Sequence, residues 1–156
     1  VVVSGVAGAT DTHVVHERPG PTTMRGVVES SEQAYEMAER DPEDVDFAEL
    51  HDMFTILEFL QFEDLGFAAK GEGWKAIEEG RTERDGDLPI NTSGGLKSKG
   101  HPLGASGVAQ AVEVYEQLLD EAGDRQLDDP EIGLACNVGG FGNCVTTTIL
   151  ETPEAE

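Results

Sequence analysis

The sequence predicts an α/β fold in which helices cover a mixed central β-sheet. Short apolar segments typical of strands alternate along the 156 residues with longer segments of helical periodicity. Each turn that carries glycine or histidine lies directly after an expected strand or directly before an expected helix. Such turns gather at one edge of an open sheet, where α/β proteins bind their ligands. We therefore expect His51, His101 and the turn at 137–140 to meet in space.

The expected strands are short, and the last of them is rich in Val, Ile and Thr. The first strand, at 1–7, is largely apolar and is expected to be buried. The others are expected at 45–50, 132–136 and 144–150, with a short extended run at 88–91. A chain of this length is enough for one domain with its own core.

Two long helices, at 23–40 and 104–122, place apolar side chains on one side and acidic side chains on the other. We expect each apolar stripe to cover the sheet. The stripe of the second helix comprises Val108, Ala111, Val112, Tyr115 and Leu119. A third helix, at 55–67, has only a narrow polar stripe at Glu58 and Gln61, so it is expected to be buried nearly all round. A short helix is expected at 74–79.

The charge of the chain is strongly negative, with 32 acidic against 10 basic residues and a net charge of −22. Such a surface repels nucleic acid and anionic membranes. No apolar run reaches the ~18 residues of a membrane span, and no secretion signal precedes the first strand. We expect a cytoplasmic protein adapted to high salt, which screens the repulsion. Because the chain begins at Val1 without Met, we expect it to be the later part of a longer protein.

The glycine-rich loop at 91–107 is the segment with the clearest chemical character. Glycine is needed where φ is positive or where a ligand lies against bare backbone. Pro102 restricts His101 to extended geometry and so gives its imidazole a defined direction. The helix that follows directs free N–H groups and a positive dipole back at the loop. The loop therefore predicts a reaction centre.

Three motifs follow one another in the chain: His51-Asp52-Met53-Phe54, the loop with NTSGG and GHP-x-GA-x-G, and Asn137-Val138-Gly139-Gly140. In this order they resemble the NEAH/NEAF, GHP and CxG loops of the thiolases. The HD-F form of the first motif is similar to sterol-carrier-protein-type and archaeal thiolases. The resemblance covers residues 1–156 as a C-terminal thiolase domain. It implies that the N-terminal half, with its nucleophilic cysteine, lies outside this chain.

The resemblance implies Claisen chemistry on acyl-CoA: condensation, or thiolysis of 3-ketoacyl-CoA, by an acyltransferase whose C-terminal half alone is inactive. His101 is then expected to stabilise an enolate oxygen and to polarise the nucleophilic cysteine of the N-terminal half. The backbone N–H of Gly139 is expected to bind the tetrahedral intermediate, with Gly140 and Asn137 in the same turn. His51 stands where conventional thiolases have an asparagine that holds a water. A coenzyme A thioester is the implied substrate, with no tightly bound cofactor and no metal.

The residues expected to bind substrate are Ser93, Gly94, Gly95, Lys97 and Met53. Lys97 lies beside the loop where it could contact a CoA phosphate, although a solvated surface position is an equal alternative.

The acid/base residue is left open by two departures from the thiolase pattern. Asn137 stands in place of the CxG cysteine, with Cys136 one residue early, and Met53 replaces the cysteine of the sterol-carrier type. Methionine carries no proton, so His51 and Cys136 remain as candidates. Neighbouring residues of a strand point to opposite faces, which disfavours Cys136.

Two other functions compete with the enzyme. The missing thiols at positions 53 and 137 suggest a non-catalytic acyl-CoA-binding or assembly subunit. A metal-dependent hydrolase would use His51, Asp52 and His101, but adjacent residues are poorly spaced as ligands of one metal. The two cysteines form no CxxC pair and predict neither a disulfide framework nor a structural zinc site.

The resemblance also implies partners. These are CoA and acyl-CoA, the N-terminal half, a second copy in a homodimer or tetramer, and in some archaeal systems HMG-CoA synthase with a zinc-ribbon/OB-fold protein.

Overall fold

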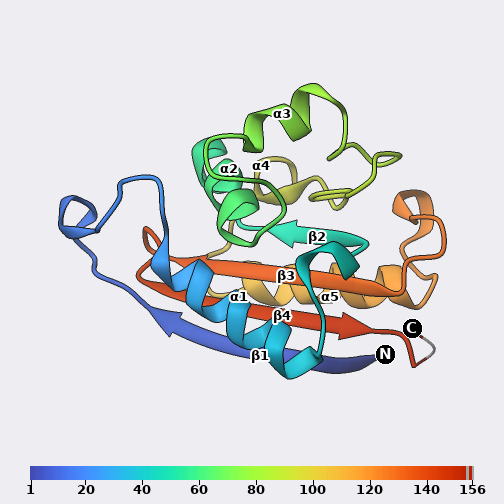
Figure 1. Cartoon of the computed structure of the whole chain (residues 1–156). Helices are drawn as coiled ribbons and strands as arrows, with labels where there is room; N and C mark the ends of the chain where they lie inside the picture. The colour runs from blue at the N-terminus through green and yellow to red at the C-terminus, as the bar shows by residue number, and fades with distance from the viewer. Residues whose placement is uncertain (154, 156) are drawn as a thin grey trace.

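The computed structural model describes residues 1–153 and 155 (Figure 1). Its strands are β1 (Val2–Thr10), β2 (Phe47–Leu50), β3 (Ile132–Gly139) and β4 (Cys144–Glu151). Its α-helices are α1 (Arg25–Ala38), α2 (Thr55–Asp64), α3 (Gly73–Glu78), α4 (Gly95–Lys99) and α5 (Ser106–Leu118). Short 3₁₀ turns lie at Val15–Glu17, Pro42–Asp44 and Gly123–Arg125. The predicted α/β fold with a mixed sheet is confirmed.

The four strands form one sheet in the order β1-β4-β3-β2. β2 runs parallel to β3, whereas β4 is antiparallel to both β3 and β1. A parallel bridge between Ala48 and Ile90 continues the sheet beyond β2. Because β2 and β3 are parallel, the residues that follow Leu50 and Cys136 leave the sheet at the same edge. This topology positions the candidate site.

The sheet has a core on each face. In Figure 1, α1 crosses in front of the sheet and α5 lies behind it. The α1 side holds the larger cluster of buried side chains, and the α5 side holds a small one around Phe47 and Val114. Gly133 in β3 makes the second cluster possible, since a Cβ there would come within 2.6 Å of both of these side chains.

The face of α5 that covers the sheet is not the predicted one. Val108, Val112 and Tyr115 of the apolar stripe are 65%, 46% and 46% exposed. The buried face carries Val114 and Leu118 together with polar side chains, among them Gln110 and Gln117. Gln110 donates to two backbone carbonyls, and Gln117 bonds to the backbone beyond the helix, so burial leaves their donors satisfied. The helix is thus fixed to the sheet by polar contacts as well as by Val114 and Leu118, and the predicted apolar stripe faces outward.

Two further burial predictions are wrong. The first strand is an edge strand rather than a buried one, with Val3 59% exposed, because among the described strands β1 pairs only with β4. In α2, Ile56 of the expected buried surface is exposed, whereas Gln61 of the expected polar stripe is wholly buried. By contrast, the predicted stripe of α1 does face the core through Val27, Ala34 and Tyr35.

Candidate active site

His51 follows the last residue of β2 and is held through its backbone by a buried glutamine. Gln61 accepts a hydrogen bond from the His51 N–H at 2.9 Å and donates to the His51 carbonyl at 2.8 Å. It also donates to the Leu57 carbonyl, one turn earlier in α2, at 2.9 Å. These two hydrogen bonds to the His51 backbone fix the chain where it turns from β2 toward α2. This role was not predicted, since Gln61 fits a solvent-facing helical stripe in the sequence.

His101 lies in the loop before α5 and is fixed from the first turn of that helix. Its Nδ1 lies 2.7 Å from the Ser106 hydroxyl, which is also within 3.3 Å of the Pro102 carbonyl. The rings of His101 and His51 meet edge to face, with centroids 4.9 Å apart and planes at 88°. Two histidines 50 positions apart in the sequence therefore share one site, as the turn pattern predicts.

The third predicted segment, at the end of β3, also reaches this site. The side-chain oxygen of Asn137 lies 3.1 Å from Nδ1 of His51. Beyond it, β3 ends at Gly139, and Gly140 turns the chain with φ of +59°. The turn is held from outside by Arg18, whose guanidinium donates to the Phe141 carbonyl at 2.6 Å. Arg18 is nearly buried beside Asp11, and the sequence did not identify either residue.

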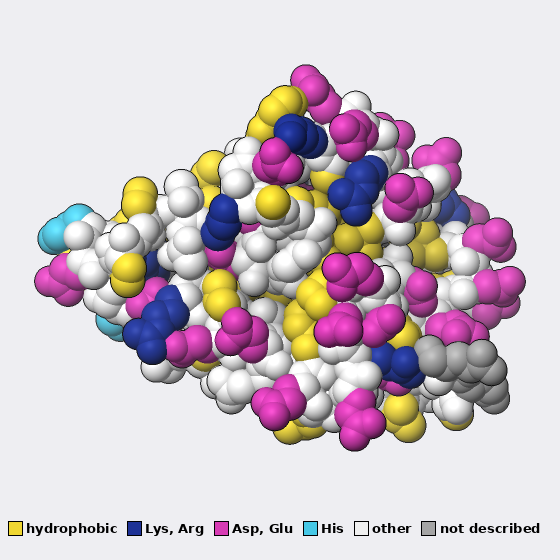
Figure 2. Space-filling view, viewed as in Figure 1, with side chains coloured by type: hydrophobic (Ala, Val, Ile, Leu, Met, Phe, Trp, Pro, Cys, Tyr) yellow, Lys and Arg dark blue, Asp and Glu magenta, His cyan; other side chains and the backbone are white. Residues whose placement is uncertain are grey.

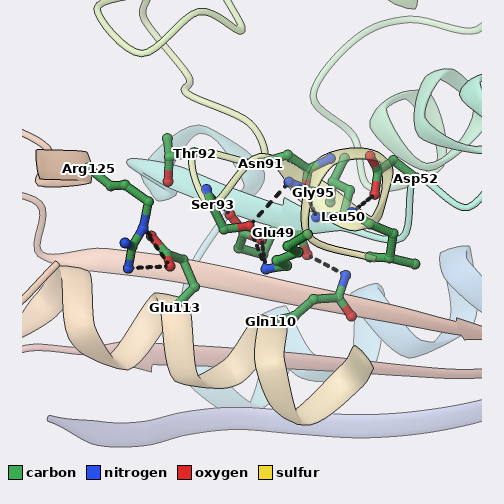
Figure 3. A network of polar contacts seen from close by, with 12 residues as sticks. Glu49, Leu50, Asp52, Asn91, Thr92, Ser93, Gly95, Gln110, Glu113 and Arg125 are labelled. Carbon is green, nitrogen blue, oxygen red and sulfur yellow. Dashed lines mark hydrogen bonds and ion pairs between the residues drawn. The ribbon is translucent and has the colours of Figure 1, made fainter. Parts of the chain in front are cut away.

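The glycine-rich loop is anchored on two carboxylates that flank His51 (Figure 3). Asp52 accepts hydrogen bonds from the backbone N–H groups of Leu96 and Lys97 at 2.6 and 3.3 Å. Gly95, with φ of +60°, leaves no room for a Cβ, which would overlap the Asp52 carboxylate. Asp52 therefore caps the start of α4, with the negative charge at the positive end of the helix.

The second anchor is Glu49, which is wholly buried in β2. It accepts hydrogen bonds from the Ser93 hydroxyl at 2.6 Å and the Ser93 N–H at 3.1 Å, and Lys99 lies 3.3 Å away. Burial raises the pKa of Glu49, although Ser93 and Lys99 act to lower it. A glutamate inside a short buried strand is the signal that could have identified this anchor.

The remaining residues predicted for the site occupy varied environments. Ser93 faces Glu49, Gly94 turns the chain with φ of +92°, and Lys97 is exposed on α4. Met53 is partly buried and packs against the larger core cluster.

Cys136 lies on the opposite side of β3 from Asn137 and is wholly buried in the larger core cluster. Burial raises the pKa of its thiol to about 12, although the Thr147 hydroxyl acts to lower it. A thiol with this pKa carries almost no thiolate at neutral pH. The alternation of strand residues explains why it cannot take the place of Asn137.

The electrostatics of the site favour neutral imidazole at His51. Burial lowers the pKa of His51, and the neighbouring His101 lowers it further, whereas Asn137 and Asp52 act in the opposite direction. A neutral ring has one nitrogen that donates and one that accepts. This is the form that can take a proton.

Within the described part of the chain, no group of three or more His, Cys, Asp or Glu side chains is arranged to hold a metal ion. The same residues include no helix with the length and apolar character needed to cross a membrane.

Comparison with known proteins finds relatives along most of this chain. Residues 7–152 match the family described as "Thiolase C-terminal domain-like". Acetyl-CoA acetyltransferase of Methanothermobacter thermautotrophicus is 48% identical over 150 residues, covering 96% of this chain and 39% of that protein. Sterol carrier protein 2 of Bos taurus is 43% identical over 129 residues, covering 81% of this chain and 24% of that protein.

The fold is also shared with a solved structure named Ltp2-ChsH2(DUF35) aldolase, at a TM-score of 0.89 and 26% identity. The match covers 98% of this chain and 40% of that one. This chain thus spans about two fifths of the archaeal acetyltransferase and of the structural neighbour. The resemblance that was based on the three motifs is confirmed: the chain belongs to the thiolase family, as a C-terminal domain related to the acetyl-CoA acetyltransferases.

Proposed function

We propose that this chain is the C-terminal catalytic half of a thiolase-type acyl-CoA acyltransferase, which condenses acyl-CoA or cleaves 3-ketoacyl-CoA by thiolysis. The observation that carries the proposal is the edge-to-face contact of His51 and His101 at 4.9 Å, beside the turn that begins at Asn137. A coenzyme A thioester is the substrate, and no tightly bound cofactor is required.

The chemistry needs donors around a thioester oxygen and a base near its α-carbon. His101 and the backbone N–H of Gly139 supply the donors, and fixed donors of this kind contribute about 3–4 kcal/mol each to the transition state. Gly140 lets the thioester approach the turn closely. His51 serves as the acid/base. Cys136 does not, because it is enclosed on the far face of β3.

The nucleophilic cysteine belongs to an N-terminal half, which we propose packs on the outward side of α5. Exposed apolar side chains line that side, among them Val108, Val112 and Tyr115. The length of the relatives supports this occupant, since 61% of the archaeal acetyltransferase has no counterpart in this chain. Without that half the chain binds no acyl group covalently and is inactive. A homodimer or tetramer of the complete protein is the assembly that the resemblance favours.

The test is acyl transfer by the complete protein that contains this chain. Incubation with acetyl-CoA is expected to yield acetoacetyl-CoA and free CoA, with an acetylated cysteine detectable by mass spectrometry. His101→Ala is expected to lower the rate of condensation at least about 100-fold, the usual cost of losing a fixed donor. Binding of CoA with neither product nor acetylated cysteine, at high and at low salt, would show that the protein is not a thiolase-type enzyme.

A second candidate is a non-catalytic acyl-CoA-binding or assembly subunit. It is favoured by Met53, which stands in place of a cysteine, and by the burial of Cys136, which keeps that thiol away from the site. The structural neighbour is named for a pairing with a DUF35 protein. On this reading, a zinc-ribbon/OB-fold protein and HMG-CoA synthase are the partners to test. Co-purification of such a partner with an inactive protein would support this candidate over the enzyme.

A further inference from the structure

The hydrogen bond between His51 and Asn137 decides which ring nitrogen carries the proton. The oxygen of an asparagine amide accepts and cannot donate. At 3.1 Å from that oxygen, Nδ1 of His51 is therefore the nitrogen that bears hydrogen. In a neutral imidazole this leaves the lone pair on Nε2.

Nε2 of His51 is also the nitrogen open to a substrate. Within the described residues it makes no hydrogen bond, and it is not one of the side-chain polar atoms enclosed without a partner. The small exposed fraction of His51, 2%, therefore includes this atom. The ring is otherwise enclosed, with its backbone held by Gln61 and its edge against His101.

A glycine in the first turn of α5 makes room for the Asn137 amide. A Cβ at Gly107 would lie 2.9 Å from Cγ of Asn137 and 3.2 Å from its Nδ2. The φ of Gly107 is not in the left-handed region, so no backbone conformation demands glycine there. Glycine inside a helix costs about 0.5–1 kcal/mol relative to alanine. The close approach of the Asn137 side chain is therefore the feature that requires glycine at position 107.

We propose that Asn137, given room by Gly107, is a positioning residue that holds His51 in the tautomer with a free Nε2. This inference rests on the proposed acyl-transfer function and deepens it. In the proton-transfer step, the C–H bond at the α-carbon of the second acyl-CoA breaks and an N–H bond forms at Nε2. The electron pair of the C–H bond passes into the enolate, whose oxygen His101 stabilises. The enolate carbon then forms a C–C bond to the acyl group carried by the nucleophilic cysteine of the other half, and the C–S bond to that cysteine breaks. The proton passes from the imidazolium to the released thiolate, which restores the starting ring.

The charges around His51 make the proposal testable through pH. The groups that act on it are His101, at 4.9 Å between ring centroids, and Asp52, its neighbour in the chain. Asn137→Asp adds a negative charge at hydrogen-bonding distance. An opposite charge this close raises the pKa of a histidine by about 1–3 units. The acidic limb of kcat/KM is therefore expected to move to higher pH by about that amount.

The decisive experiment compares variants of the complete protein in acyl-CoA condensation. Asn137→Ala is expected to lower kcat at least about tenfold with little change in KM, because general base catalysis contributes about 10²–10⁴-fold. Gly107→Ala is expected to act in the same direction without lowering Tm, because it displaces Asn137 while favouring the helix. Gly20→Ala is the matched control, since its Cβ would meet only the Thr23 hydroxyl at 3.9 Å.

A second readout does not depend on activity. The ¹⁵N shifts of labelled His51 are expected to show hydrogen on Nδ1 in the unaltered protein and a mixture of tautomers in Asn137→Ala. Hydrogen on Nε2 in the unaltered protein would overturn the inference, as would an unchanged kcat and pH profile in Asn137→Ala and Asn137→Asp. Absence of condensation by the unaltered protein would instead count against the proposed function, while the ¹⁵N shifts would still decide the tautomer.

Discussion

At the scale of single residues, the site depends on groups that orient the two imidazoles. Ser106 is 2% exposed and bonds to Nδ1 of His101 at 2.7 Å. Ser106→Ala is expected to lower kcat/KM for condensation by at least about tenfold, because the ring loses its orientation. The free energy of unfolding should fall by only about 1 kcal/mol, the net value of one hydrogen bond. Ser106→Thr keeps the hydroxyl and is the control; equal activity of all three proteins would contradict this role.

Glu49 gives a second prediction at this scale, through the pH dependence of stability. Burial raises the pKa of Glu49 in the folded protein above the ordinary value of 4.5. At a pH between these two pKa values, the folded state holds a proton that the unfolded state releases. Its contribution to stability is therefore fully present below that value and is lost as pH rises through the folded pKa. Relative to Glu49→Gln, the unaltered protein is expected to lose free energy of unfolding as pH rises from 4.5. Parallel curves from urea unfolding would contradict this.

The residues that orient the site were the least visible in the sequence. His51, His101 and Asn137 could be identified because motifs and turn positions mark them. Ser106 and Gln61 could not, since each acts through hydrogen bonds whose partners are set by the fold. A polar residue in a helix has the same pattern whether it faces solvent or a buried backbone group.

At the scale of elements, the position of α5 in the sequence was predicted but its orientation was not. Periodicity locates an apolar stripe, yet it does not say whether the stripe covers this sheet or another unit. The buried face is set by Gln110, Gln117 and Glu113, which bond to backbone groups and to Arg125. The edge position of β1 was missed for a similar reason, because strand pairing is not local in sequence.

This orientation predicts unequal effects of charge on the two faces of α5. Val114 is wholly buried in this domain, so Val114→Glu should destabilise any protein that contains it. Val112 is 46% exposed in this domain, so Val112→Glu should strongly destabilise the protein only if another domain covers Val112. In the complete protein we expect Val112→Glu to lower Tm by several degrees. If Val112→Glu lowers the free energy of unfolding by no more than about 0.5 kcal/mol, as ordinary surface substitutions do, this face is not covered by another domain.

At the scale of the whole molecule, the main feature is the excess of acidic over basic residues, 32 against 10. Figure 2 shows Asp and Glu side chains around most of the visible face, with few Lys and Arg between them. With a net charge of −22, mutual repulsion opposes the compact state. Raising salt from about 0.1 M to about 1 M shortens the screening length from about 10 Å to about 3 Å. Tm is therefore expected to rise with KCl over this range.

The control for the salt prediction removes charge locally. Asp85, Asp87 and Asp128 line one open depression with Arg84. Replacing these three aspartates by asparagine should raise Tm at low salt and flatten its dependence on KCl. A Tm that does not change with KCl in either protein would show that repulsion is unimportant and that the acidic composition has another origin.

The central claim is that His51, His101 and the turn at Gly139 together bind a thioester. A crystal structure of the complete protein with an acyl-CoA tests it most directly. The thioester oxygen is expected within about 3.1 Å of Nε2 of His101, the distance at which a donor stabilises developing charge. Nε2 of His51 is expected on the side of the α-carbon. A thioester bound away from both rings would show that these groups do not form the substrate site.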